Sequence, residues 1–235
     1  MKNIDLESYK ENQHMVIGEF LHELKTPLSI IRTHLETEIS NENIPLNVRK
    51  KMVMDVEEVA RLTQLIAKMK TLLSCEFEDE KVYFKKDSFL ALLVDVIDFL
   101  EPLAEEKGQK LSFIAAQNIE YFMHIDKCKQ LFYNLIHNAI KYTPAGGTIE
   151  VTLIQNETSI RVDIKDSGYG ILDEDKENIF KQFYRVKDTN NEEGTGLGLA
   201  LCRAIAQMHS AEIELYSEID NGSTFSVVFP KKGLE

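Results

Sequence analysis

Two long runs of helical periodicity fill the first 75 residues of the chain. Apolar residues recur at three- and four-residue steps from about residue 5 to 39, and again from about residue 46 to 73. Only one glycine and two prolines interrupt this stretch. Because a short polar segment, residues 40–45, separates the runs, we expect two helices that fold back as an antiparallel hairpin.

Each expected helix carries an apolar stripe along its whole length. The stripes comprise Leu21, Leu24, Leu28, Ile31 and Leu35 in the first helix, and Met52, Val56, Val59, Leu62, Ile66, Met69 and Leu73 in the second. Two helices alone bury little of such a surface. A hairpin of this kind is typical of a homodimer in which two hairpins form a four-helix bundle, so we expect residues 1–75 to be a dimerisation domain.

A polar cluster interrupts the first stripe at Phe20-Leu-His-Glu-Leu-Lys-Thr-Pro-Leu28. His22 lies at the edge of the stripe, where solvent reaches it, and Thr26 lies one turn later on the same face. Pro27 cannot donate a hydrogen bond to the carbonyl of Glu23, which loosens the backbone beside the histidine. Taken alone, this segment also fits an ordinary histidine at the solvated edge of a helix.

The sequence pattern changes after the hairpin. Residues 76–81 are an acidic run without helical spacing, which indicates a linker, and residues 82–232 mix short apolar stretches with helical ones. Strands are expected at 82–84, 111–114, 119–123, 148–153, 159–164, 212–216 and 224–229, and helices at 88–107 (capped by Ser88), at 126–142 (capped by Asp126) and after Gly196. This order predicts an α/β sandwich with a partly antiparallel sheet.

Composition excludes several classes of protein. The net charge is −12, and no basic cluster indicates a nucleic-acid footprint. Cys75, Cys128 and Cys202 lie far apart and form no C-x-x-C pair, so neither a disulfide framework nor a zinc site is expected. No apolar run reaches the roughly 18 residues of a membrane helix, and no signal peptide is visible.

Three motifs in the second domain carry polar chemistry. The first is Asn134-Leu-Ile-His-Asn138-Ala-Ile-Lys141-Tyr142, which falls on a helix and puts Asn134, Asn138 and Lys141 on one face. Carboxamide oxygens are hard neutral ligands that suit Mg²⁺, and a lysine beside them suits phosphate. The alternative interpretation is the polar outer face of an amphipathic helix.

The other two motifs are rich in glycine. Asp166-Ser-Gly168-Tyr-Gly170 follows an expected strand, where a carboxylate can accept a hydrogen bond from a ring amino group such as that of adenine; an ordinary strand-exit turn is the alternative. Gly194-Thr-Gly196-Leu-Gly198 opens an expected helix, whose first N–H groups form an anion site. It differs from a P-loop and from a dinucleotide fingerprint in spacing and context. Residues 186–193 before it are polar and are expected to form a mobile lid.

The order and spacing of these motifs resemble the sensor histidine kinases of two-component signalling, over nearly the whole chain. Phe20 to Leu28 resembles the phosphoacceptor box, Asn134 to Tyr142 the N box, and Asp166 to Gly170 the first glycine box. Ile179-Phe-Lys-Gln-Phe-Tyr-Arg185 resembles the F box, and Gly194 to Leu199 the second glycine box. The resemblance implies an ATP-binding domain with the fold shared by type II topoisomerases and certain chaperone ATPases (the Bergerat or GHKL fold).

The resemblance also implies a role for each matching residue. His22 would take the γ-phosphoryl group of ATP, with Glu23 as its general base and Arg185 contacting the phosphates during transfer. Asn138, assisted by Asn134, would hold Mg²⁺. The nucleotide would contact Asn134, Asn138, Lys141, Tyr142, Asp166, Gly168, Gly170, Gly194, Thr195, Gly196, Leu197 and Gly198. The Glu23-Leu-Lys-Thr26 tetrad resembles the family's phosphatase signature, in which Thr26 would orient a water that dephosphorylates the response regulator.

Three positions depart from the family pattern. Leu21 stands where the family often has a small polar residue, which should alter local packing more than chemistry, and Ser167 stands where Asn is frequent. His209-Ser-Ala-Glu212 lacks the glycines that often follow this histidine, which puts the turn geometry in doubt. None of the residues expected to touch ATP or Mg²⁺ is missing, so we expect an active kinase rather than a degenerate one.

Two other functions fit part of the sequence. One is a related ATPase of chaperone or mismatch-repair type, against which the histidine box on a dimerising hairpin argues. The other is a non-catalytic adaptor that dimerises and docks a regulator, against which the nucleotide motifs argue. The chain contains no sensor domain, so we expect it to be the cytoplasmic catalytic portion of a longer, membrane-anchored bacterial receptor; a soluble kinase that senses through a partner is the alternative.

Overall fold

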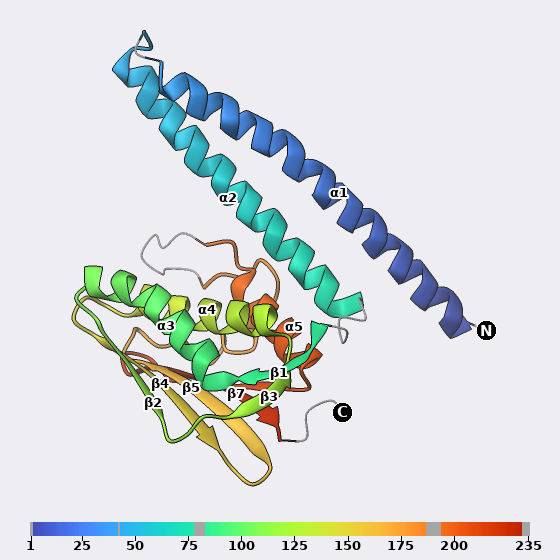
Figure 1. The fold of residues 1–235 in the computed structure, drawn as a ribbon, viewed down its shortest axis with the longest axis vertical. Helices are drawn as coiled ribbons and strands as arrows, with labels where there is room; N and C mark the ends of the chain where they lie inside the picture. Colours follow the sequence, from blue (N-terminus) through green and yellow to red (C-terminus); the bar gives the residue numbers. More distant parts are fainter. Residues whose placement is uncertain (1, 42, 78–82, 187–193, 232–235) are drawn as a thin grey trace. The chain divides into compact units, whose positions relative to one another are not determined.

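A computed structural model describes residues 2–41, 43–77, 83–186 and 194–231, with side chains from residue 16 onward except those of residues 19, 76 and 77 (Figure 1). The chain divides into two compact units, Met1–Phe77 and Glu78–Glu235. In the described residues, no helix combines the length and the apolar character that crossing a membrane requires.

The first unit is a helical hairpin, as the sequence predicts. Helix α1 runs over Lys2–Ile39 and packs along α2, Leu46–Phe77. The turn between them is held by backbone hydrogen bonds, among them Ser40 N to Thr37 O at 3.2 Å. Because α2 continues to Phe77, the first two residues of the expected linker 76–81 are helical; the rest of that segment lies outside the described residues.

A single hairpin leaves most of its apolar stripes accessible. Of the described side chains in this unit, the buried apolar ones are Leu21, Val59 and Leu72. Ile31 in the first stripe is 46% exposed, and Leu62 in the second is 36% exposed. These exposed residues belong to the surface that the expected four-helix bundle would bury.

The second unit is an α/β sandwich. Its elements are β1 (Lys85–Ser88), α3 (Phe89–Glu106), β2 (Lys110–Ala115), β3 (Glu120–Met123), α4 (Ile125–Tyr142), β4 (Thr148–Gln155), β5 (Ser159–Asp166), the 3-10 helix η2 (Asn178–Phe180), α5 (Gly198–Met208), β6 (Glu212–Glu218) and β7 (Gly222–Pro230). The main sheet has the order β2-β4-β5-β7-β6; its β2–β4 pair is parallel and the other pairs are antiparallel. Strands β1 and β3 form a separate antiparallel pair, and helices α3, α4 and α5 cover one face of the main sheet (Figure 1).

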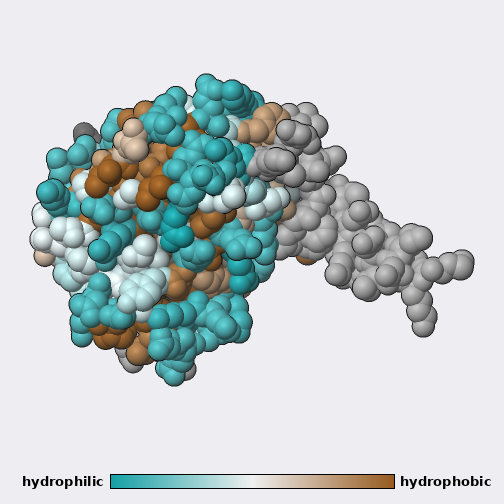
Figure 2. Space-filling model, turned by 90° about the horizontal axis from the view of Figure 1, so that it is seen from below, coloured by the Kyte–Doolittle hydropathy of each residue, from teal (hydrophilic) through white to brown (hydrophobic). Residues whose placement is uncertain are grey.

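The core lies between the helices and the sheet. Strands β4 and β5 each alternate buried apolar residues toward the helices with more accessible residues on the other face, while β7, between β5 and β6, is mostly buried and includes the buried Ser226 on its outer face. On that outer face Arg161 donates hydrogen bonds to Asp163, Glu214 and Ser226, each at 2.7 Å. Figure 2 shows one side of the molecule, where hydrophilic residues predominate and hydrophobic ones lie between them.

Two sequence-based assignments in this unit are wrong. Of the strand expected at 82–84, residue 82 lies outside the described residues, and Tyr83 and Phe84 are not in a strand; strand β1 starts one residue later, at Lys85–Ser88. Phe84 packs into the core, where its ring lies 4.7 Å from that of His209. Asp126 does not cap α4, which begins at Ile125 after His124; Asp126 lies in the first turn, where the helix dipole favours a carboxylate. Ser88 does cap α3, since its Oγ accepts a hydrogen bond from Ala91 N at 3.0 Å.

Candidate functional site

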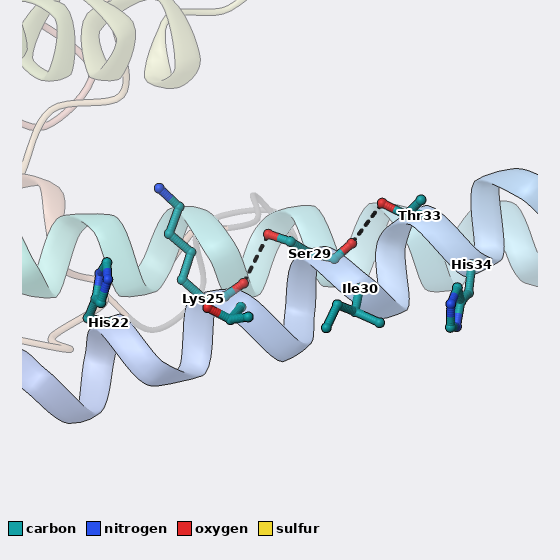
Figure 3. Close-up of a pocket in the computed structure, with 7 residues that line it drawn as sticks. His22, Lys25, Ser29, Ile30, Thr33 and His34 are labelled. Atoms are coloured by element: carbon teal, nitrogen blue, oxygen red, sulfur yellow. Dashed lines mark hydrogen bonds between the residues drawn. The ribbon is translucent and has the colours of Figure 1, made fainter.

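His22 lies on the surface of α1 in a shallow groove formed by that helix. The groove is lined by His22, Lys25, Thr26, Ser29, Ile30, Thr33 and His34 (Figure 3). Helix α1 passes through Pro27 without a break, so the proline does not end the helix beside His22. The imidazole is exposed while the preceding Leu21 is buried, which anchors the backbone and leaves the ring accessible to another molecule.

The hydroxyl of Thr26 differs from those that follow it on α1. Ser29 and Thr33 donate hydrogen bonds to carbonyls four residues earlier, at 2.9 and 3.0 Å, as Figure 3 shows. Thr37 does the same at 2.7 Å. No residue in the described part of the chain forms a hydrogen bond with the Thr26 hydroxyl, which is exposed in the same groove as His22. This hydroxyl is therefore open to a water or a ligand.

Glu23 does not share this groove. Adjacent residues on a helix point about 100° apart, and Glu23 is not among the residues that line it. Within the described residues no hydrogen bond joins the Glu23 carboxylate to the His22 ring. The expected base role of Glu23 therefore requires a change of rotamer. Lys25, which the sequence analysis did not single out, does line the groove; its spacing of three residues from His22 is the signal that could have identified it.

In the second unit, the polar face of α4 lies against the second glycine segment. A Cβ placed on Gly194 would lie 3.3 Å from Lys141 Nζ, and one placed on Gly198 would lie 3.8 Å from Asn134 Oδ1. The structure thus brings two N-box residues together with both ends of this glycine segment. Asn138 is half-buried one turn from Asn134 on the same helix.

Among the residues that the structure describes, Asn134 and the start of α5 both leave polar groups without protein partners. The Asn134 side chain is 6% exposed, and its Nδ2 has no hydrogen-bond partner among the described residues. Helix α5 begins at Gly198 after the buried Leu197, which cannot cap it with a side chain. An uncapped helix start presents free N–H groups and the positive end of a dipole, which together favour an anion.

Asp166 ends β5 with its carboxylate buried. Its Oδ1 accepts hydrogen bonds from Gly168 N at 2.8 Å and from Ser223 N at 3.2 Å. Burial raises the pKa of Asp166, and these two N–H donors oppose that rise. Both hydrogen bonds use Oδ1, so Oδ2 is left to accept from a ligand amino group. Ser223, in β7, was not identified from the sequence because its contribution is a backbone N–H.

Gly168 lies where a side chain would not fit. A Cβ there would lie 2.5 Å from Tyr142 O and 2.7 Å from Asp166 Oδ1. Tyr142 O accepts a hydrogen bond from Tyr169 N at 3.3 Å, which ties the N box to the first glycine box. The Tyr142 ring also lies 5.0 Å from Lys141 Nζ. Gly170 follows, packed against the backbone of β6.

The F box reaches the second glycine segment through the backbone. Phe183 N donates to Gly196 O at 3.0 Å, and a Cβ on Gly196, whose φ is +70°, would lie 2.6 Å from the carbonyl carbon of Phe183. Thr195 Oγ1 accepts a hydrogen bond from Leu197 N at 3.4 Å. Arg185 is exposed next to the expected lid; of that lid, residues 187–193 lie outside the described residues.

The turn after His209 adopts the geometry that glycine favours. Ser210 has a φ of +53°, so a non-glycine residue takes the left-handed conformation there. His209 itself is buried: its Nδ1 donates to Ile205 O at 2.8 Å, and its Nε2 accepts from His124 N at 3.1 Å. His209 therefore links the end of α5 to the start of α4 and has a structural role.

The comparisons with known proteins agree with this arrangement. A family model described as histidine kinase-, DNA gyrase B- and HSP90-like ATPase matches residues 123–233. The chain is 29% identical over 218 residues to the sensor protein SrrB of Staphylococcus aureus, a match that covers 92% of this chain and 37% of SrrB. The chain therefore spans a little over a third of the length of such curated relatives.

Solved structures of similar fold include the catalytic domain of histidine kinase ThkA, at 30% identity and a TM-score of 0.56, with 63% of this chain and 97% of that one covered. Full-length ShkA in complex with AMPPNP shares the fold at a TM-score of 0.80 and 20% identity, over 92% of this chain and 45% of that one. The Acinetobacter baumannii histidine kinase AdeS shares it at a TM-score of 0.64 and 24% identity, over 90% of this chain and 98% of that one.

Proposed function

The chain belongs to the histidine kinase family, and from that premise we propose that it phosphorylates its own His22 with ATP and Mg²⁺ and passes the phosphoryl group to an aspartate of a response regulator. The observation that carries this proposal is the meeting of Asn134 and Lys141 with the glycine segment 194–198. An ammonium group, an unpartnered buried amide and an uncapped helix start converge there, and all three suit a nucleotide polyphosphate with its metal ion.

We propose the remaining nucleotide contacts from the motifs and from the free acceptor on Asp166. Asp166 Oδ2 accepts from the adenine amino group, Tyr142 lines the base pocket, and Gly168 and Gly170 shape its wall. The segment Gly194, Thr195, Gly196, Leu197 and Gly198 cradles the phosphates. Asn138 and Asn134 would hold Mg²⁺ through their amide oxygens, and the ion would supply charge neutralisation to the phosphates.

The transfer step needs an exposed imidazole, which α1 supplies. A ring nitrogen of neutral His22 attacks the γ-phosphorus, and the bond from that phosphorus to the bridging oxygen breaks with its electron pair leaving on ADP. The proton on the other ring nitrogen passes to Glu23 after the rotamer change noted above. Arg185 neutralises the charge that develops on the transferred group.

One labelling experiment tests this function. With γ-labelled ATP and Mg²⁺, wild-type protein should acquire acid-labile label on one histidine, His22→Ala should acquire none, and His34→Ala, which changes the other histidine of the groove, should label normally. ATP turnover without protein label would instead favour the related ATPase of chaperone or mismatch-repair type; the family model's description also names DNA gyrase B-like and HSP90-like ATPases. Neither label nor turnover would favour an adaptor.

We also propose a phosphatase activity that uses Thr26. Its hydroxyl is free where those of Ser29 and Thr33 are bonded to the helix, so it can orient a water for attack on the regulator's acyl phosphate. Thr26→Ala should slow dephosphorylation of the cognate regulator roughly a hundredfold while His22 still labels. The control is Ser29→Ala. Unchanged dephosphorylation in Thr26→Ala would refute this role.

The partners proposed for the chain are a second copy of itself and a response regulator. The exposed apolar stripes of α1 and α2 are the surface for dimerisation. Nucleic acid is not a proposed partner, because the net charge is −12 and the sequence has no basic cluster. Because the similar sensor protein is longer than this chain, we propose that the chain acts as the cytoplasmic catalytic portion of a membrane-anchored receptor.

A further inference from the structure

The last turn of α4 ends on carbonyl groups that the helix itself cannot satisfy. Ile140 O would normally accept from the residue four positions later, but that residue is Pro144, which has no N–H. Lys107 Nζ and Gln109 Nε2 donate to Ile140 O instead, at 3.2 and 3.0 Å. Lys107 Nζ also donates to Lys141 O at 3.1 Å.

We call Lys107 and Gln109, with their hydrogen bonds to the end of α4, the α4 clamp. Gln109 also bonds to the backbone beyond the helix. Its Nε2 also donates to Thr143 O at 2.5 Å, and its side chain is 6% exposed. Lys107 adds a positive charge at the negative end of the α4 dipole. Two side chains from the connection between α3 and β2 therefore fix the backbone that carries two proposed nucleotide contacts, Lys141 and Tyr142.

The local sequence explains why these two side chains reach α4. Helix α3 ends in a motif in which Gly108 N donates to Glu105 O at 2.8 Å and Gln109 N donates to Ala104 O at 2.9 Å. Gly108 has a φ of +64°, which this helix ending requires. The motif reverses the chain and places Lys107 and Gln109 against the end of α4.

The same helix end is also coupled to Asp166. Tyr142 O accepts from Tyr169 N, and Gly168 packs against that carbonyl while its N–H holds Asp166 Oδ1. A shift of the α4 end would therefore move the lysine proposed for phosphate and the carboxylate proposed for adenine together. Neither Lys107 nor Gln109 is among the proposed nucleotide contacts.

We propose that Lys107 and Gln109 are positioning residues of the nucleotide site, acting through the backbone of Lys141 and Tyr142. The proposal rests on the ATP-binding function proposed above. It predicts that loss of the clamp lowers ATP affinity even in protein that stays folded, because the two sides of the pocket lose their fixed spacing.

The test compares ATP affinity in Lys107→Met, Lys107→Arg, Gln109→Met and two controls, all in the complete 235-residue chain. Lys110→Met removes an exposed lysine close by, and Gln117→Met removes an exposed glutamine that bonds to Gln155. We expect about a tenfold rise in the Kd of MgATP for Lys107→Met and for Gln109→Met. Lys107→Arg should restore affinity to within about twofold, because it keeps a cationic donor.

Two further measurements separate positioning from general stability. Circular dichroism at the assay temperature selects variants that are folded, and if Lys107→Met is not among them, Gln109→Met decides. Amide hydrogen exchange should accelerate at Tyr169 in both methionine variants, while Ile160 in β5 keeps its rate. A structural role alone would lower the unfolding midpoint and leave the Kd of the folded protein unchanged.

The outcomes for the two proposals are distinct. Wild-type protein that binds no ATP would overturn both the proposed function and this inference. Wild-type protein that binds ATP, together with folded Lys107→Met and Gln109→Met that bind it within about twofold of wild type, would overturn only the positioning role.

Discussion

Two opposing effects act on the pKa of the Asp166 carboxyl group. Burial disfavours its charged form, while the N–H groups of Gly168 and Ser223 favour it. Both donors bind Oδ1, and the second oxygen is the one proposed to accept from the nucleotide. If Asp166 has this role, it lowers the stability of the folded protein and adds to nucleotide affinity, so the two properties should respond to substitution in opposite directions.

Replacing this carboxylate by an amide should change ATP affinity and protein stability differently. Asp166→Asn keeps an oxygen for Gly168 and Ser223 but turns an NH₂ group toward the adenine amino group. We expect ATP affinity to fall by about 1.5–3 kcal/mol, the worth of a charged hydrogen bond, with no loss of stability at pH 7. Isothermal titration and urea denaturation measure the two effects, with Asp98→Asn on the exposed face of α3 as control. Unchanged affinity would remove Asp166 from the site.

The same residue predicts a pH dependence of stability. The pKa of Asp166 is raised above its ordinary value of 3.8, so on acidification the folded protein binds this proton before the unfolded chain does. Its contribution to the free energy of unfolding therefore increases as pH falls through the raised pKa, and is lost as pH rises. In urea titrations, any stability advantage of Asp166→Asn over wild type should shrink between pH 7 and pH 4; an advantage that grows would contradict the assignment.

Ser210 shows strain at the level of one backbone angle. A serine at φ +53° costs conformational energy that glycine avoids, and this side chain is exposed, so it adds no packing. Ser210→Gly should stabilise the second unit by about 0.5–1 kcal/mol. Thermal melting should show a rise of roughly 2–5 °C. Ser159→Gly, in strand β5, should lower the melting temperature instead.

Among the elements, α4 is held at both ends by residues far from it in sequence. His209, from the end of α5, binds the backbone N–H of His124 at its start, and Lys107 and Gln109 bind its last carbonyls. Between these anchors the helix presents Asn134, Asn138 and Lys141 along one face. A site on a rigid helix fixed in this way can hold its ligand groups at constant spacing.

The elements differ in how far the sequence alone predicts them. Periodicity located both hairpin helices, and the Ser88 cap and Gly108 gave the ends of α3, because these signals are local. The strand expected at 82–84 was misplaced because a short apolar stretch does not show whether its residues pair in a strand or, like Phe84, pack into the core from a loop. The clamp on α4 was missed because Lys107 and Gln109 act over more than thirty residues of sequence separation.

The hairpin helices carry a prediction about assembly. Ile31 belongs to the apolar stripe of α1 and is 46% exposed in one chain. Ile31→Glu puts a charge into the proposed bundle core, which should convert a dimer into a monomer at micromolar concentration. Light scattering measures the mass. Ile30→Glu is the matched control, since Ile30 lines the His22 groove instead and should leave the dimer intact.

At the scale of the whole molecule, the proposed reaction is divided between two compact units. His22 and Thr26 lie on the hairpin, and the proposed ATP contacts lie in the α/β unit. The sequence motifs identify residues within each unit because each motif is a short local pattern. They do not predict that Ser223 N donates to Asp166, or that no described residue forms a hydrogen bond with the Thr26 hydroxyl. Both facts depend on the hydrogen-bond pattern of the folded chain.

This division predicts two unfolding transitions that respond to different variables. MgATP at about 100 times its Kd should stabilise the α/β unit by about 2.7 kcal/mol through mass action, and should leave the hairpin transition in place because all the residues proposed to bind the nucleotide lie in the α/β unit. Raising the protein concentration should shift the hairpin transition alone, because its stability depends on dimerisation. Scanning calorimetry of wild type and Ile31→Glu measures both effects: the substitution should lower the hairpin transition and leave the ATP shift intact. A single transition that moves with both variables would show that the units unfold together.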